Sequence, residues 1–467
     1  MKRTLGSKSH YYLARASILL LITALIAGIV GCDATSGYTL TMAVTPSGSG
    51  TAIDLTDASP YAAGTRVTVK AEANEGYLFA RWEVTEGHFT YPTWPQTTFR
   101  MPDQNAIVTA IFVSSAIRTW YDLNAIRYKL DGSYILMNDL DSSTAGYEEL
   151  AGPAANYGYG WFPIGSNYRR FTGNLDGQGY QIRDLFVGGG EYVGLFGVID
   201  VGGDIVDLAV VNVTAVGAGC VGGLAGSNEG GNIRGSYVSG SITGEGLGIG
   251  GLVGINDGTV NDSNSTVYVS CSITGADEGT GGLIGINYGT VNDCNSAGSV
   301  TGGLLVGGLV GLHMNGAISN SYSGCNVTGM AAIGGLVGYA EDTVLNCYST
   351  GHVTGEVAVG GLVGANAQES IVSNSYSIGS VTGDDDVGGL VGENSGTVTN
   401  SFWDIEASGQ AVSDGGMGMN TTQMNDIATF SGADWDIIVV ALNETNLAYT
   451  WNIVNNVTYP FLSWQSI

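Results

Sequence analysis

Short stretches in which apolar and polar residues alternate, separated by glycine-rich turns, run through most of this 467-residue chain. Three clear stretches lie at 38–44, 66–71 and 106–112, and turn residues occupy 46–50 and 74–77 between them. An alternation with a period of two places every second side chain on one face, which is typical of half-buried strands. Residues 38–114 therefore predict a small β domain.

A five-residue pattern, Gly-Gly-Leu-x-Gly, repeats through the next part of the chain. It occurs seven times, after a relaxed copy at 193–197, with its leucine at Leu224, Leu252, Leu283, Leu309, Leu336, Leu362 and Leu390. Successive leucines are 26 to 31 residues apart, a regularity that indicates a stacked array. Each period holds three short β-like pieces, and its Gly, Thr, Ser, Asn and Val disfavour helices. Residues 190–404 predict an all-β fold: a β-helix (β-solenoid) of about eight coils or slightly more.

Strand periodicity within each coil also predicts ladders of like residues. If Val344, Asn346 and Tyr348 share one strand face, the same register aligns two sets across coils. The first set is Asn320, Asn346, Asn374 and Asn400, and the second is Tyr322, Tyr348, Tyr376 and Phe402. Stacked amides hydrogen-bond along the axis and stacked rings bury area, which favours interior ladders beside the leucines. The alternative is an exposed aromatic stripe that binds sugar rings.

The ends of a stacked array need covers, because open strands pair with other chains. Residues 118–189 are expected to form the N-terminal cap and the first coils, with a short helix, a strand and irregular chain over 118–160. Residues 405–467 are expected to cap the last coil.

The charge excludes some partners. The chain has 42 acidic and 15 basic residues and a net charge of −27, so there is no basic patch to displace counterions from nucleic acid. The same charge disfavours direct adsorption to anionic lipid. Glycine is abundant, at 75 residues, but follows no Gly-X-Y period, which excludes collagen.

The first 31 residues contain four bases, no acid and an apolar run at 18–30. This arrangement is typical of an export signal, and the run is short for a membrane span. Residues 29–32, Ile-Val-Gly-Cys, resemble the lipobox of bacterial lipoproteins, in which the signal is cut before a lipidated cysteine. The resemblance implies a signal peptide at 1–31, lipid on Cys32, a tether at 32–37 and a membrane anchor in the cell envelope. An ordinary secretory signal with an incidental cysteine is the alternative, and which membrane would hold the lipid stays open.

The N-terminal β region resembles the divergent internalin-type B-repeat of bacterial surface proteins. The matching segments are 44–50, 61–65, 75–79, 81–82 and 98–102. The resemblance implies a spacer or stalk without catalytic residues. Tyr91, Trp82 and Trp94 could form a binding face, although core packing is the stronger expectation for Trp82.

The Gly-Gly-Leu-x-Gly repeats resemble the GLUG motif of bacterial surface proteins. The segments 122–126, 138–141, 161–165 and 171–179 match the lead-in that usually precedes it. Similar proteins include adhesins and some large immunoglobulin-A-cleaving peptidases, whose protease is a separate domain without a counterpart in this sequence. The resemblance implies a repeat protein displayed on the cell surface.

Candidate chemistry is sparse. The sequence has no nucleophile elbow, no zinc-protease motif and no phosphate-binding loop, and no cofactor is expected. Asp384, Asp385 and Asp386 could supply a carboxylate pair or weak calcium ligands. Glu245 and Glu356 occupy the same turn in other coils, which favours a solvated acidic edge. The five cysteines after Cys32 are expected to be small ladder residues without disulfides, with Cys271 aligned to Cys325 and Cys294 to Cys347.

Three classes of function follow. The favoured one is a non-catalytic surface β-helix that displays its repeats for adhesion, with an extracellular glycan or matrix protein as partner. The alternatives are an envelope scaffold without a specific ligand and, least favoured, a β-helix polysaccharide-degrading enzyme.

Overall fold

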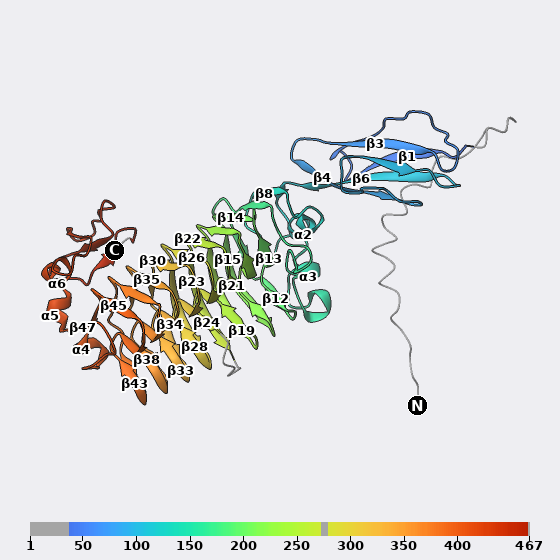
Figure 1. The fold of residues 1–467 in the computed structure, drawn as a ribbon. Coiled ribbons are helices and arrows are strands. Elements are labelled where there is room, and N and C mark those ends of the chain that lie inside the picture. The colour runs from blue at the N-terminus through green and yellow to red at the C-terminus, as the bar shows by residue number, and fades with distance from the viewer. Residues whose placement is uncertain (1–36, 272–278, 466–467) are drawn as a thin grey trace, which may run out of the picture.

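The structure, a computed structural model, describes residues 37–271 and 279–465. A small β domain precedes a long solenoid whose coils stack side by side, and the C-terminal segment closes the far end (Figure 1). The expected signal peptide, Cys32 and almost all of the tether lie outside the described residues. Within the described ranges, no helix has the length and apolar content needed to cross a bilayer.

The N-terminal domain packs two three-stranded sheets against each other. One contains β1 (Leu40–Thr45), β6 (Ala106–Ser114) and β4 (Tyr77–Val84), and the other contains β2 (Gly50–Asp54), β3 (Arg66–Ala73) and β5 (Gln96–Arg100). Trp82 is buried between them and donates its indole N–H to the carbonyl of Trp94 at 3.1 Å. Tyr91 and Trp94 are exposed and stack on each other with ring centroids 4.4 Å apart. The expected core role of Trp82 is confirmed.

A short entry segment closes the first coil. It contains β7 (Ala116–Ile117), α2 (Trp120–Ala125), the 3-10 turn Ile126–Tyr128, β8 (Ser133–Leu136), α3 (Tyr147–Leu150) and a second 3-10 turn, Ala155–Gly158. Thr119 and Asp122 form a capping box that fixes the start of α2. Trp120 and Leu123 of this helix are fully buried against the end of the solenoid core. The short helix and strand agree with the expectation for 118–160.

Each of the eight coils contributes strands to four different sheets. The sequence pattern predicted only three strands per coil. Strands from successive coils pair in parallel and form four long sheets, here called first to fourth in the order in which each coil visits them. The difference arises at the motif leucine, which occupies a corner between two strands. Leu362 at such a corner and Val363, which begins the next strand, are both fully buried. The predicted number of coils is confirmed.

The first two sheets contain eight strands each within the described residues. The first sheet consists of β12 (Tyr192–Val193), β16 (Cys220–Val221), β20 (Gly248–Gly250), β24 (Gly279–Gly281), β28 (Leu304–Gly307), β33 (Ala331–Gly334), β38 (Val357–Gly360) and β43 (Asp385–Gly388). The second sheet consists of β13 (Phe196–Asp200), β17 (Ala225–Glu229), β21 (Val253–Asn256), β25 (Ile284–Asn287), β29 (Val310–His313), β34 (Val337–Ala340), β39 (Val363–Asn366) and β44 (Val391–Asn394).

The other two sheets begin before the first full coil. The third contains β7, β8, β9 (Asn174–Asp176), β14 (Asp204–Val206), β18 (Asn232–Arg234), β22 (Thr259–Asn261), β26 (Thr290–Asn292), β30 (Ala317–Ser319), β35 (Thr343–Leu345), β40 (Ile371–Ser373) and β45 (Thr397–Thr399). The fourth contains β10 (Gln181–Arg183), β11 (Phe186–Gly188), β15 (Ala209–Gly217), β19 (Tyr237–Gly244), β23 (Asn264–Cys271), β27 (Asn295–Thr301), β31 (Tyr322–Ser323), β32 (Asn326–Thr328), β36 (Tyr348–Ser349), β37 (Val353–Thr354), β41 (Tyr376–Ser377), β42 (Val381–Thr382), β46 (Phe402–Asp404) and β47 (Met417–Met419).

The motif leucines lie in the interior of the solenoid. Leu252, Leu283, Leu309, Leu336, Leu362 and Leu390 are all fully buried in one continuous apolar core. Valines and isoleucines of all four sheets complete that core. Because each coil adds the same few side chains, the core continues without a break from the entry segment to the last coil.

The asparagines of the predicted ladder lie at an outer corner instead of the interior. Asn320, Asn346, Asn374 and Asn400 each have a positive φ, between 47° and 53°, and separate a strand of the third sheet from a strand of the fourth. Asparagine tolerates this left-handed conformation better than most residues. The bend ends the strand alternation, so the assumption of one continuous strand face was wrong. Asn346 still donates to the Asn320 side chain at 3.2 Å.

The aromatic ladder points outward from the fourth sheet, where the C-terminal segment covers it. Tyr322, Tyr348 and Tyr376 stack with ring centroids 4.9 and 5.0 Å apart. Trp451 and Trp435 of the cap pack against this ladder. The ladder is therefore neither the interior ladder that was expected nor the exposed stripe that was its alternative.

The C-terminal segment does more than close the last coil. It contains α4 (Ile405–Ser408), β47, α5 (Thr421–Met424), α6 (Ile427–Ser431), β48 (Ile437–Val439), β49 (Trp451–Ile453) and β50 (Phe461–Leu462). β47 pairs with β46 at the end of the solenoid. The rest folds back along the fourth sheet, where the Trp464 indole donates to the carbonyl of Asn320 in the fifth coil.

A second amide ladder, which the sequence analysis missed, is truly buried. Asn228, Asn256 and Asn287 are fully buried, and each side chain donates to the next at 2.8 Å. The ladder continues to the ring of His313 and resumes at Asn366, which donates to Asn394. The signal was present, because these residues occupy the fourth position after the motif leucine.

The described cysteines are free and buried. Cys294 and Cys347 follow left-handed corner residues, as Ser321 and Ser375 do, and their thiols contact a carbonyl two residues earlier. Burial raises the pKa of both thiols to about 12, which makes them unreactive. The predicted alignment of Cys271 with Cys325 was wrong. Strand pairing aligns Ser270 with Thr301, and Thr301 with Thr328. Cys271, which follows Ser270, therefore lies beyond the position of Thr328 and not at that of Cys325.

Candidate functional site

In the second half of the solenoid, the strands of the first sheet adopt a different backbone conformation. Leu305, Ala332, Ala358 and Asp386 have φ values of 49°, 54°, 53° and 49° at the same position of four successive coils. Such left-handed residues are uncommon outside glycine, asparagine and aspartate, and are held in place only by surrounding structure. Ala332 and Ala358 consequently pack outside the solenoid interior, together with Leu305 and Tyr339.

The second sheet supplies a facing row of outward side chains. Strand pairing places Ile286, Leu312, Tyr339, Ala365 and Glu393 in one line across five coils. The aliphatic members of this row are nearly inaccessible to solvent although they do not join the interior core. They are covered because the first sheet lies against them.

Glycine allows the two sheets to meet so closely. A Cβ at Gly338, the last glycine of one motif copy, would lie 2.6 Å from the backbone of both Leu305 and Val306. No side chain fits in that space, so the position requires glycine. The repeated glycine of the motif thus brings a second-sheet strand onto the first-sheet strand of the preceding coil.

The two rows border a hollow on the outside of coils 4 to 6, here called the outer groove. It has a volume of about 370 Å³ and is lined by Ile286, Tyr288, Leu305, Leu312, Met314, Tyr339 and Glu341. Ala332, Ala358 and Ala365 form a buried apolar cluster beside this hollow, against which Leu305 and Tyr339 pack. In the last coil the same two rows end in the exposed residues Asp386 and Glu393.

The groove is strongly negative. Desolvation raises the pKa of Tyr339, and the charges of Glu341 and Glu393 raise it further. No lysine or arginine follows Arg234 in the sequence. Accordingly, the carboxylates around the groove have no cationic side chain of their own part of the chain to pair with.

The groove lining is mainly apolar, with a few polar groups. Its lining provides apolar surface, tyrosine hydroxyls and carboxylates, and contains no histidine, cysteine, serine or basic residue. Among residues 37–271 and 279–465, no group of three or more His, Cys, Asp and Glu side chains could hold a metal ion.

The three predicted acidic candidates lie in the last coil, beyond this groove. Asp384 precedes β43, the last strand of the first sheet, and Asp385 and Asp386 begin that strand. All three side chains are exposed. They do not converge on a shared ion position in the described structure. Their place on a terminal strand agrees with the interpretation as a solvated acidic edge.

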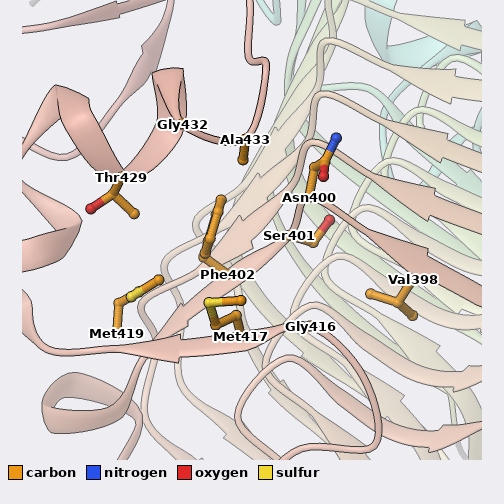
Figure 2. A pocket seen from close by; sticks show the side chains of 10 residues that line it. All are labelled: Val398, Asn400, Ser401, Phe402, Gly416, Met417, Met419, Thr429, Gly432 and Ala433. Atoms are coloured by element: carbon orange, nitrogen blue, oxygen red, sulfur yellow. The ribbon is translucent and has the colours of Figure 1, made fainter.

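A second hollow, of about 470 Å³, lies between the last coil and the cap. Figure 2 shows Phe402 and Met417 at its centre, with Thr429 and Met419 on one side and Val398 on the other. Its lining contains no titratable side chain, and only Asn400, Ser401 and Thr429 add polar side-chain atoms. It is the joint between the solenoid and its cap, and it contains no acid–base group.

The groove-lining residues do not stand out in any single motif copy of the sequence. Their signal is visible once the motif copies are aligned. The third residue after the motif leucine is Ile286, Leu312, Tyr339 or Ala365 in four successive copies, and the fourth residue before the leucine is Leu305, Ala332 or Ala358 in the last three of these. Apolar residues at two outward positions indicate a covered face.

The described structure defines a β-helix repeat protein with an additional N-terminal β domain. Family comparison identifies residues 38–116 as a divergent InlB B-repeat domain and residues 217–243, 331–354 and 355–382 as GLUG motifs. The chain therefore carries an InlB-type B-repeat followed by GLUG repeats, as the two resemblances indicated.

Two curated proteins share part of this sequence. One is named "Putative Gly-rich membrane protein", from Evansella cellulosilytica, and is 36% identical over 119 residues, which are 24% of this chain and 13% of that protein. Halomucin of Haloquadratum walsbyi is 33% identical over 132 residues, 27% of this chain and 1% of halomucin. The chain thus spans only a small part of the length of these relatives.

A solved structure titled a "putative immunoglobulin A1 protease" from Bacteroides ovatus is also similar. The match covers 75% of this chain and 92% of that one, with 19% sequence identity and a TM-score of 0.45.

Proposed function

We propose that this protein is exported, anchored to the bacterial cell envelope by lipid on Cys32, and displayed outside the cell as a non-catalytic binding protein. In this proposal the B-repeat domain is a spacer. The outer groove of the solenoid is the surface that contacts an extracellular glycan or matrix protein.

The observation that carries the proposal is the outer groove itself. It is built by a backbone conformation repeated in four coils and is lined by apolar and tyrosine side chains. Interiors of ligand sites commonly combine apolar walls with a few polar groups. The fourth sheet is a poorer candidate in the same coils, because the cap covers its aromatic side chains.

Binding is tested with the full chain purified in mild detergent and applied to surfaces coated with matrix proteins and glycans. Tyr339→Ser should weaken binding about tenfold, because it removes a ring from the centre of the groove. Tyr268→Ser, which changes an exposed tyrosine of the fourth sheet in the third coil, is the matched control. Equal binding by the two variants, or no binding by the wild type, would contradict the proposal.

Anchoring and exposure need a separate experiment in cells. Mass spectrometry should find the lipid on Cys32 of the wild type, and Cys32→Ala should lack both the lipid and the cut before residue 32. Protease treatment of intact cells should release peptides from residues 190–404. Proteinase K is required because no lysine or arginine follows Arg234, so trypsin cannot cut within residues 236–404. Full protection of the solenoid, in cells whose known surface proteins are cut, would favour the scaffold alternative.

A further inference from the structure

We propose that the outer groove binds an extended, positively charged segment of a partner protein. This inference rests on the proposed binding function and names the chemical class of its partner. Lysine or arginine side chains of that segment would lie along the apolar wall of the groove, with their charged ends at the carboxylates of this face.

The charge balance of the chain is the first argument. Residues 235–467 contain 21 carboxylates and no lysine or arginine. All ion pairs among the described residues use Arg234 or an earlier base. Glu341 at the groove, and Asp386 and Glu393 farther along the same face, have no lysine or arginine partner, and a cationic segment would complement their charge.

The apolar lining of the groove is the second argument. Ile286, Leu305, Leu312 and Met314 give the hollow an aliphatic wall, and Tyr339 packs against the buried alanine cluster beside it. Lysine and arginine bury their aliphatic stems on such a surface while their charged ends stay at its edge. The ring of Tyr339 also attracts a cation placed over its face.

The spacing of the carboxylates is the third argument. Glu341 belongs to the sixth coil and Glu393 to the eighth. Two coils separate them by about 10 Å along the axis, which is about the length of three residues of an extended chain. A single strand lying along the axis can thus place one basic side chain at Glu341 and another at Glu393. A neutral glycan would leave these charges uncompensated, and an acidic glycan would be repelled.

The test uses the full chain in mild detergent and a fluorescent peptide of alternating lysine and alanine, followed by anisotropy. Salt near 0.15 M limits long-range attraction, because the screening length is then about 8 Å. Glu341→Gln with Glu393→Gln should weaken binding about five- to tenfold. The matched control, Glu245→Gln with Glu444→Gln, removes the same charge at exposed positions outside the groove and should change affinity by less than about twofold.

Equal weakening by the two double variants would overturn the inference, because it would show attraction by overall charge alone. Absence of peptide binding by the wild type would overturn it as well. Circular dichroism and thermal unfolding check that each variant keeps its fold. If the wild type binds a matrix or glycan surface through Tyr339 but ignores the cationic peptide, the proposed function survives and this inference fails.

Discussion

The first four and the last four coils of the solenoid share one interior but differ on the outside. Both halves contain the motif leucines in a continuous core. In the fourth sheet, the first half has single strands of seven to nine residues, from β15 to β27, whereas coils 5 to 7 split the same path into two short strands. The left-handed residues of the first sheet occur only in coils 5 to 8 among the described residues.

The outward residues change at the same boundary. Along one column of the fourth sheet, Asn264 and Asn295 are followed by Tyr322, Tyr348 and Tyr376. The cap covers the tyrosine part of this column, and the outer groove lies across coils 4 to 6. A repeat can therefore keep its core and specialise its surface, because outward positions do not take part in the stacking of the interior.

The largest expected effect on stability comes from detaching the C-terminal cap from the second half of the solenoid. Trp451 is fully buried and contacts Tyr348, Tyr376 and Trp435. Trp451→Ala should lower the free energy of unfolding by about 4 kcal/mol, because it leaves a large cavity. Hydrogen exchange should quicken in the fourth sheet of coils 5 to 8 and stay unchanged in coils 1 to 4. Trp94→Ala, at an exposed site, is the control, and uniform quickening along the solenoid would contradict the comparison.

The next effect concerns the shared interior. Asn287→Ala removes the partner of Asn256 and of His313 in the buried amide ladder. The loss should be about 3 kcal/mol in urea unfolding, because buried polar groups are left unpaired. Asn346→Gly, at a left-handed outer corner, should change stability by less than about 0.5 kcal/mol, since glycine adopts that conformation freely. Similar losses for the two variants would show that the two amide ladders are equivalent.

The stability of the fifth coil, the first of the second half, is expected to depend on pH through His313. Burial lowers the pKa of His313 to about 4, although the nearby charge of Asp342 opposes this shift. The unfolded chain therefore binds a proton at higher pH than the folded chain does, and stability falls as the pH drops from about 6.5 toward 4. Lowering the pH from 7.5 to 5 should reduce the free energy of unfolding by about 2 kcal/mol through this histidine.

His313→Asn extends the amide ladder and should remove this part of the loss, measured as urea midpoints at the two pH values. The exposed His352→Asn is the control and should retain the pH dependence of the wild type. An equal fall in stability for His313→Asn and wild type would contradict the assignment.

The smallest effect on stability is expected in the last coil. Asp385 and Asp386 stand where the preceding coil has Val357 and Ala358, and β43 is the terminal strand of its sheet. Charges on a terminal strand oppose pairing with other chains. Asp385→Val with Asp386→Ala should change stability by less than about 1 kcal/mol and promote concentration-dependent association in light scattering. A strictly monomeric double variant would show that these aspartates do not protect the edge.

The sequence alone determined the repeat, the number of coils and the inward leucines. These features depend on residues that recur once per coil, and neighbouring copies bury them in the same way. It did not determine the strand register at the corners. Asn346 interrupts the alternation by its left-handed conformation, a local change that reverses which later side chains point inward.

Only the tertiary structure decided which outward columns are covered and which form a groove. Tyr322 is covered because Trp464, more than a hundred residues later, packs on its ring. The groove exists because Gly338 allows one sheet to lie on the backbone of another. Contacts between distant segments leave no periodic signal in either segment, so their consequences become visible only when the chain is folded.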